Sequence, residues 1–122
     1  MKHDASTLVR RLCRAAGATA TGAMLMLGAT AQAADSAAQL ELGKKLFLQT
    51  AVPACALCHT LKAAGAEGAV GPVLDELKPD ASRVATALRN GIGQMPSYKA
   101  SLSEAEIEAL SVYVAKASGG AP

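Results

Sequence analysis

The sequence predicts an all-α fold of about four to five short helices wrapped around one covalently attached cofactor. Two observations predict the helices. Apolar residues recur at the three- and four-residue spacing of helices in several stretches, and no stretch alternates between apolar and polar residues as a strand would. A third observation predicts the cofactor. Cys55, Cys58 and His59 form a Cys-x-x-Cys-His motif, the signature of covalent haem attachment.

The N-terminus has the pattern of a secretory signal peptide. A basic start that includes Lys2 precedes a run of small and apolar residues at 15–30. The run ends at residues 31–33, Ala-Gln-Ala, the small-x-small pattern after which signal peptidase cuts. It is short and weakly apolar for a membrane span, which needs about 20 strongly apolar residues. We therefore expect residues 1–33 to be cleaved; an uncleaved anchor is the alternative.

Residues 34–122 are expected to form one domain in the periplasm, with no stable membrane span. The pair Arg10-Arg11 invites comparison with twin-arginine export signals. The residues that follow do not continue that motif, and haem is attached to c-type cytochromes after export of the unfolded chain. We therefore expect the general secretory (Sec) route.

Removal of residues 1–33 leaves few side chains that can bind a metal. The sequence holds three Cys, two His and four Met, and beyond that segment only Cys55, Cys58, His59 and Met95 remain. Four of the 12 Lys and Arg residues and one of the 10 Asp and Glu residues also lie in the segment, so the domain is close to neutral. No basic block indicates a nucleic-acid surface.

The first helix is expected at about residues 37–48, after a capping-box pattern at residues 36–39. Leu40, Gly43 and Phe47 form one stripe of this helix. Glycine in a helix interior costs about 1 kcal/mol relative to alanine. We expect the compensation at Gly43 to be the close approach of another helix; a tolerated defect is the alternative.

Short elements follow along the middle of the chain. They are a helical turn at 55–59, a loop at 60–72, a helical turn at 74–78, a helix at 81–89 and a flexible loop at 91–96. Asp80 is expected to cap the start of the helix at 81–89, and Gly91 stands where a C-terminal glycine would end it.

The last helix begins with a second capping-box pattern, formed by Ser103 and Glu106. It is expected to run to about residue 117 and to place Ile107, Leu110 and Val114 on one face, with Tyr113 beside them.

The Cys-x-x-Cys-His motif suits haem chemistry better than its alternatives. The two thiols can add across the two vinyl groups on one edge of the ring, and His59 then lies under the iron. A disulfide redox motif requires a thioredoxin-like βαβ setting, which the sequence does not show. A zinc site requires two further ligands, and no other His or Cys follows residue 33. A structural disulfide would leave His59 unexplained. A large apolar cofactor would also complete the core of a small domain that has no Trp.

Met95 is the candidate for the second axial ligand by elimination. A lone methionine usually fills a gap in a core, but Met95 lies on a Gly-bounded loop before Pro96. His/Met ligation raises the potential and fills the sixth position, which is typical of an electron carrier. The alternatives are a lysine, water or an open sixth site, and an open site would indicate gas or peroxide sensing or catalysis. A metal-free structural or disulfide module is the third class.

Pro72 follows Gly71 in the loop after the motif. Proline is a backbone acceptor without a donor, and ligating histidines generally donate their other ring N–H to such an acceptor. Pro72 is therefore a candidate acceptor for His59; a simple turn proline is the alternative.

Motifs spread over residues 34–122 resemble a small class I monohaem c-type cytochrome, and they come in the order of that family. They are Gly43-x-x-x-Phe47, Cys55-x-x-Cys58-His59, Gly71-Pro72-x-Leu74, Gly93-x-Met95-Pro96 and a final helix with Tyr113-Val114. The resemblance implies a cytochrome c-like fold with one haem c, whose first and last helices cross near Gly43 and Tyr113.

The same resemblance implies roles for individual residues. Cys55 and Cys58 would bind the haem covalently, His59 and Met95 would bind the iron, and the Pro72 carbonyl would accept from His59. The thioether edge of the haem would be exposed as the electron port. Because the chain has no Trp, partners for the haem propionates would come from the backbone or from a small set of polar side chains: Tyr98, Arg83, Arg89 and Lys99.

Residues 55–62 and 71–79 are similar to cytochrome subunits that are paired with periplasmic molybdenum sulfite dehydrogenases. This closer resemblance implies an electron carrier rather than an enzyme. It would accept electrons from such a dehydrogenase and pass them to a downstream cytochrome or oxidase.

Overall fold

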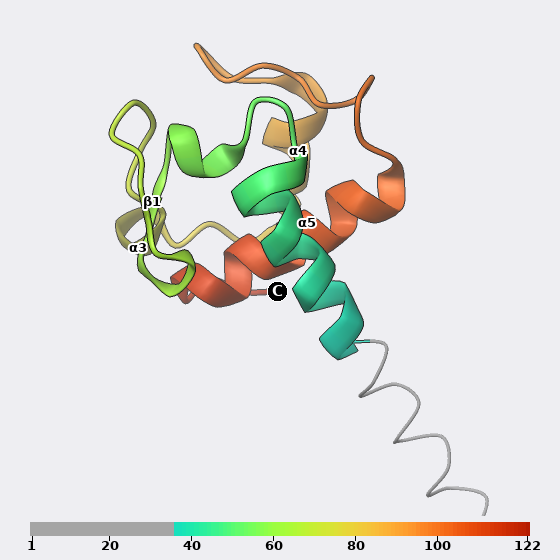
Figure 1. The fold of residues 1–122 in the computed structure, drawn as a ribbon, viewed down its shortest axis with the longest axis horizontal. Helices are drawn as coiled ribbons and strands as arrows, with labels where there is room; N and C mark the ends of the chain where they lie inside the picture. Colours follow the sequence, from blue (N-terminus) through green and yellow to red (C-terminus); the bar gives the residue numbers. More distant parts are fainter. Residues whose placement is uncertain (1–35) are drawn as a thin grey trace, which may run out of the picture. The chain divides into compact units, whose positions relative to one another are not determined.

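Short helices and one small hairpin make up residues 36–122, the part of the chain that the computed structural model describes (Figure 1). The expected signal peptide at 1–33 lies outside these residues. Within residues 36–122, no helix is long and apolar enough to cross a membrane. The helical architecture confirms the predicted all-α class.

The first helix is α-helical over residues 36–45 and continues as the π-helical turn η1 (Leu46–Thr50). It therefore runs slightly further than the sequence predicted. Residue 36 is helical, where the sequence predicted a non-helical cap residue. Of the predicted stripe, Gly43 and Phe47 are buried and Leu40 is half-buried; Leu46 is buried as well.

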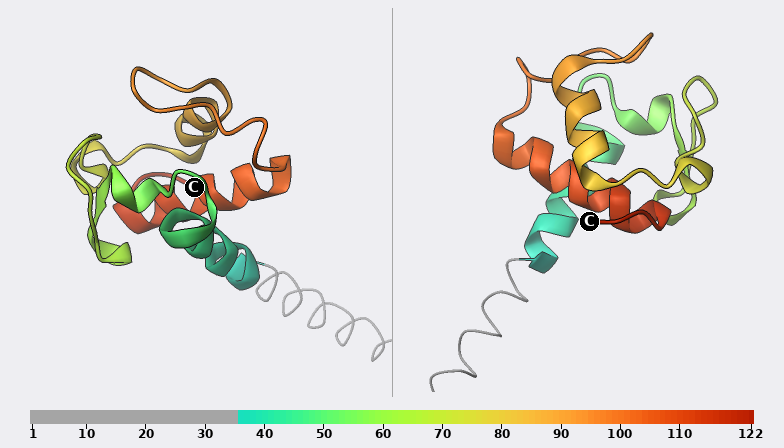
Figure 2. Two further views of the ribbon diagram at one scale, coloured as in Figure 1. Left: turned by 45° about the horizontal axis from the view of Figure 1, so that its top comes forward. Right: turned by 180° about the vertical axis from the view of Figure 1, so that it is seen from behind.

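The first helix crosses the last helix, α5 (Glu104–Ser118), at Gly43 (Figures 1 and 2). A Cβ atom added to Gly43 would overlap the Ala109 carbonyl oxygen and lie 2.5 Å from the Tyr113 Cβ. One turn further on, the rings of Phe47 and Tyr113 pack at a centroid distance of 6.1 Å and an angle of 56°. The predicted helix crossing is confirmed, and the glycine is there because no side chain fits.

The helical turn predicted at 55–59 is present as the 3-10 turn η2 (Cys55–Leu57). The segment that follows differs from the predicted loop. It contains one 3-10 turn and two two-residue strands: β1 (Thr60–Leu61), η3 (Lys62–Ala64) and β2 (Ala66–Glu67). The strands pair antiparallel, and Gly65 makes the turn with a φ of 64°. Alternation cannot be recognised over two residues, which explains why the sequence predicted only loop here.

Two helices lead from the hairpin to the loop that carries Met95. They are α3 (Leu74–Leu77) and α4 (Ala81–Asn90). The Asp80 side chain accepts a hydrogen bond from the Arg83 backbone N–H at 2.7 Å, as the sequence predicted for an N-cap. This bond lowers the pKa of the Asp80 carboxyl.

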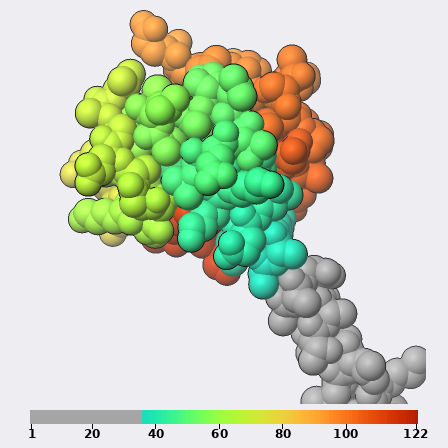
Figure 3. All heavy atoms as spheres, in the orientation of Figure 1, coloured from blue at the N-terminus to red at the C-terminus, as the bar shows by residue number. Residues whose placement is uncertain are grey.

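Helix α5 begins with the predicted capping box. Ser103 N–H donates to the Glu106 carboxylate at 2.8 Å, and Glu106 N–H donates to the Ser103 hydroxyl at 3.3 Å. α5 packs against α4 and against the first helix. In the space-filling view the first helix and the segment that follows it (teal to green) cover much of α5 (Figure 3). Its predicted inner face is buried accordingly: Ile107, Leu110, Tyr113 and Val114.

Replacing Gly43 by alanine tests the helix crossing. Alanine would ordinarily stabilise a helix interior by about 1 kcal/mol. Here the new Cβ meets α5, so we expect Gly43→Ala to lower the free energy of unfolding by about 1–3 kcal/mol, as overpacking does. Urea denaturation of the haem-loaded protein measures this. Lys44→Ala, on the exposed face of the same helix, is the control and should change little. A Gly43→Ala protein as stable as the wild type would contradict the close crossing.

Candidate haem site

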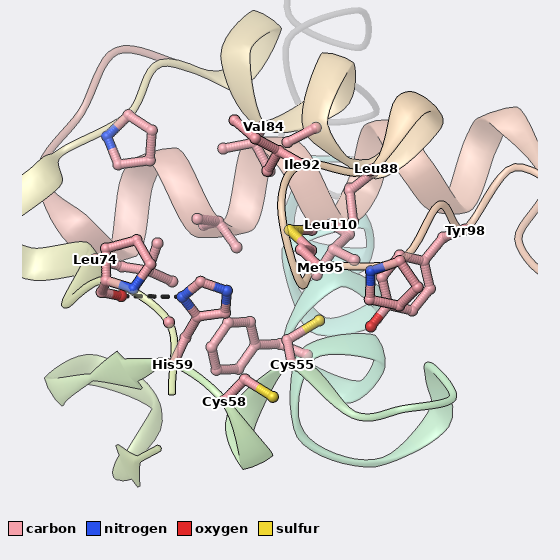
Figure 4. Close-up of a pocket in the computed structure, with 18 of the residues that line it drawn as sticks. Cys55, Cys58, His59, Leu74, Val84, Leu88, Ile92, Met95, Tyr98 and Leu110 are labelled. Carbon is pink, nitrogen blue, oxygen red and sulfur yellow. Dashed lines mark hydrogen bonds between the residues drawn. The ribbon is translucent and has the colours of Figure 1, made fainter. Parts of the chain in front are cut away.

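A cavity of about 780 Å³ lies between the motif, α4, α5 and the loop after α4 (Figure 4). Its lining is mostly apolar. Two segments supply the candidate ligands, and we call them the cysteine segment (residues 53–59) and the Met95 loop (residues 91–98). Helix side chains such as Phe47 and Leu110 close the cavity from the core.

Cys55 and Cys58 both line this cavity as free thiols. The 3-10 turn places them on it, with hydrogen bonds from the backbone N–H groups of Cys58 and His59 to the Cys55 carbonyl at 3.1 and 2.9 Å. Burial raises the pKa of the Cys55 thiol to about 11. A thiol held protonated is a poor redox nucleophile. Residues 36–122 also contain no cluster of three His, Cys, Asp or Glu side chains that could hold a metal ion.

The His59 ring is oriented by the backbone that follows the hairpin. Its Nδ1 lies 2.9 Å from the Pro72 carbonyl oxygen, the contact that the sequence predicted (dashed line in Figure 4). A carbonyl can only accept, so Nδ1 carries the proton and Nε2 keeps its lone pair. That nitrogen is thus available as a metal ligand.

Two glycines hold the backbone of residues 68–72 against the motif. A Cβ added to Gly71 would lie 2.5 Å from the His59 Cε1, and one added to Gly68 would lie 2.5 Å from the Cys58 carbonyl carbon. The Gly71 N–H also donates to the Cys58 carbonyl at 2.7 Å. Sequence reasoning did not assign a role to these glycines. The signal was their regular spacing in the stretch after the motif, although that spacing alone does not say what the backbone approaches.

Met95 enters the cavity from the wall across from the cysteine segment (Figure 4). Its loop is shaped by two reciprocal backbone hydrogen bonds between Ile92 and Met95, each of 3.0 Å. The Met95 side chain is half-buried and packs against the core. The two predicted iron ligands therefore lie in one cavity on different walls.

Tyr98 also lines the cavity and is 3% exposed. Its hydroxyl donates to the Pro53 carbonyl oxygen at 2.7 Å. Burial, together with the nearby Cys55, raises the pKa of Tyr98 to about 12, so the hydroxyl keeps its proton. That proton is donated to the Pro53 carbonyl. A hydrogen bond from Tyr98 to a haem propionate stays a prediction.

The other predicted propionate partners differ in position. Arg83 lines the cavity. Arg89 pairs with Glu104 at 2.8 Å instead, an exposed ion pair that raises the pKa of Arg89 and lowers that of Glu104. Lys99 does not belong to the lining.

These side chains fit a covalently bound haem. The cavity offers two thiols for the vinyl groups, an imidazole nitrogen and a thioether for the iron, and apolar walls for the ring. Such an iron supplies a one-electron couple whose potential depends on its axial ligands.

Comparisons with known proteins agree with this chemistry. Residues 38–114 match the family described as cytochrome C oxidase, cbb3-type, subunit III. Among solved structures, the chain is similar to the c-type cytochrome SorU from Sinorhizobium meliloti, with 55% sequence identity and a TM-score of 0.64. That match covers 68% of this chain and 94% of SorU. No match was found among curated protein sequences.

Proposed function

The chain belongs to the cytochrome c family, as an electron carrier with covalently bound haem c, and we propose that it holds one low-spin haem ligated by His59 and Met95. Cys55 and Cys58 form the thioether bonds. The carrier takes electrons from a periplasmic dehydrogenase and passes them to a terminal acceptor.

The observation that carries this proposal is the arrangement of His59. Its Nδ1–H donates to the Pro72 carbonyl oxygen at 2.9 Å, so the lone pair of Nε2 is available to bind the iron. A hydrogen bond of this kind fixes the ring orientation and raises the basicity of the ligating nitrogen. Met95 supports a closed iron site. Among residues 36–122, it is the one sulfur ligand in the cavity lining besides the two cysteines, so it is available for the sixth position of the iron.

Three segments that supply much of the cavity lining carry no charged side chain, and we call them the uncharged rim; Arg83, on α4, is the one charged side chain in the lining among the described residues. The segments 46–61, 68–74 and 90–98 contain no Lys, Arg, Asp or Glu. Leu57, Val70 and Ile92 on these segments are 69%, 75% and 69% exposed. Exposed apolar side chains that gather in one patch mark contact surfaces. We propose that the electron donor covers this rim with an apolar surface of its own.

We propose a periplasmic molybdenum sulfite dehydrogenase as that donor. The support is the resemblance of residues 55–62 and 71–79 to cytochrome subunits paired with such enzymes. Oxidation of one sulfite to sulfate releases two electrons, and one haem takes one electron at a time. Two molecules of the carrier are therefore reduced per sulfite.

Residues 1–33 are proposed to direct export by the Sec route and to be removed, which leaves a periplasmic domain of residues 34–122. The support is the basic, apolar and small-residue pattern of that segment.

Met95→Ala tests the sixth ligand. Removal of the thioether should lower the reduction potential by a sizeable part of the roughly 0.8 V that axial ligation spans. It should also let cyanide bind the ferric protein readily. Redox titration and cyanide titration measure these effects, and Gln94→Ala on the same loop is the matched control. A potential unchanged in Met95→Ala, or a native protein that binds cyanide or CO readily, would favour the open-site alternative.

Sulfite-dependent reduction tests the donor. With purified periplasmic molybdenum sulfite dehydrogenase and sulfite, we expect rapid haem reduction whose rate depends little on ionic strength, because the rim is uncharged. Leu57→Asp should slow this reaction about tenfold, since an unpaired carboxylate in the contact costs on the order of 1–3 kcal/mol. Ala105→Asp, in the first turn of α5 and outside the cavity lining, adds the same charge as a control. Reduction by another dehydrogenase alone would contradict the sulfite assignment.

Processing of the N-terminus is tested by the mass of the haem protein isolated from the periplasm. We expect the chain to start at Ala34, because cleavage follows the small residue Ala33. Ala33→Arg should block processing and leave the protein membrane-bound. A periplasmic protein that retains residues 1–33 would contradict the prediction.

A further inference from the structure

A single side-chain hydrogen bond joins the two walls of the cavity. Tyr98 lies three residues after Met95, and its hydroxyl donates to the Pro53 carbonyl at 2.7 Å. Pro53 stands two residues before Cys55, on the opposite wall. Because proline has no N–H, its carbonyl is the one backbone hydrogen-bonding group at that position. The bond therefore links the Met95 loop to the cysteine segment across 45 residues of sequence.

Other hydrogen bonds anchor the Met95 loop to its neighbours in the sequence. The Tyr98 carbonyl accepts from the backbone N–H groups of Ser101 and Leu102 at 3.0 and 2.9 Å, and three bonds return to α4. They are Gly91 N–H to the Ala87 carbonyl at 2.8 Å, Tyr98 N–H to the Leu88 carbonyl at 2.7 Å and the Ser97 hydroxyl to the Arg89 carbonyl at 2.5 Å. Within residues 36–122, no other hydrogen bond runs from this loop to the cysteine segment. The Tyr98 hydroxyl therefore connects the Met95 loop to the cysteine segment, whereas the bonds to α4 fix only the ends of the loop.

The tip of the Met95 loop has few buried side chains, so packing contributes little to holding it in place. Ile92, Gly93 and Gln94 are exposed, and Met95 is only half-buried. Segments with few buried apolar contacts open more easily than the core. Opening of this loop would carry Met95 away from His59, because the two side chains stand on different walls.

From this placement we propose that Tyr98 is a positioning residue that holds the Met95 loop against the cysteine segment and so keeps the thioether on the iron. The proposal rests on the proposed role of Met95 as sixth ligand. The Tyr98 aromatic ring fills the cavity wall, and its hydroxyl supplies the connection between the walls.

A contact between Tyr98 and a haem propionate is the competing role. A phenol has one proton to donate, and it cannot serve Pro53 and a propionate at once. Loss of a propionate contact would shift the potential and its dependence on pH. Loss of the link to Pro53 would instead make Met95 easier to displace.

Tyr98→Phe in the haem-loaded protein separates these roles, because it removes only the hydroxyl. We expect cyanide to bind the ferric variant roughly three- to tenfold more tightly, the change that corresponds to the loss of one buried hydrogen bond. The sulfur-to-iron charge-transfer band should also fade at a lower temperature than in the wild type. Cyanide titration and temperature-dependent absorption spectra measure both effects.

Tyr113→Phe is the matched control. It removes the same atom from the other tyrosine of the chain, whose buried hydroxyl has no hydrogen-bond partner among the described residues. Tyr113 packs on Phe47 and does not line the cavity. Its cyanide affinity and absorption band should match the wild type. Ile107→Val, at a buried position outside the cavity lining, controls for general destabilisation, and its cyanide affinity should also be unchanged.

Three outcomes would overturn the positioning role. They are a Tyr98→Phe protein with wild-type cyanide affinity, a shift confined to the potential and its pH dependence, and an equal gain in cyanide affinity in Ile107→Val. Failure of the proposed function is distinguishable, since Met95→Ala would then keep the wild-type potential. If Met95→Ala opens the site and Tyr98→Phe does not loosen it, only the positioning role fails.

Discussion

The close crossing of the first helix and α5 at Gly43 is the contact on which the rest of the domain depends. Because no side chain separates the helices there, Phe47 and Leu110 come near enough to close one side of the cavity. α4 then packs along α5 and carries the Met95 loop to the other side. A larger residue at position 43 would move apart the walls that the haem must contact.

The cofactor is part of the core of this domain. A domain of this size buries a modest fraction of its surface, and this one has a single Phe and no Trp. Its cavity of about 780 Å³ is lined mainly by apolar side chains. Haem c therefore serves two purposes, since its iron takes up the electron and its ring fills the core in place of the large aromatic side chains that the chain lacks.

Two polar side chains of the cavity are oriented by proline carbonyls. His59 is oriented by the Pro72 carbonyl and Tyr98 by the Pro53 carbonyl. Among the described residues, Arg83 is the one charged side chain in the lining. The exposed pair of Arg89 and Glu104 lies outside the lining and contributes little stability by itself. The uncharged rim and the buried, directed donors favour a carrier that keeps its iron coordination while it exchanges electrons with a protein partner.

Local sequence determined most of the helices and the place of haem attachment, because helix caps, glycines and the Cys-x-x-Cys-His motif act over a few residues. Local patterns predicted the helices begun by Asp80 and Ser103 and the buried face of α5. The family resemblance added the crossing at Gly43 and the contact of His59 with Pro72. Only the tertiary structure decided the hairpin at 60–67, the approach of Gly68 and Gly71 to the motif and the bond from Tyr98 to Pro53. These contacts join residues distant in sequence or strands too short to form a pattern, so they depend on how the chain folds back on itself.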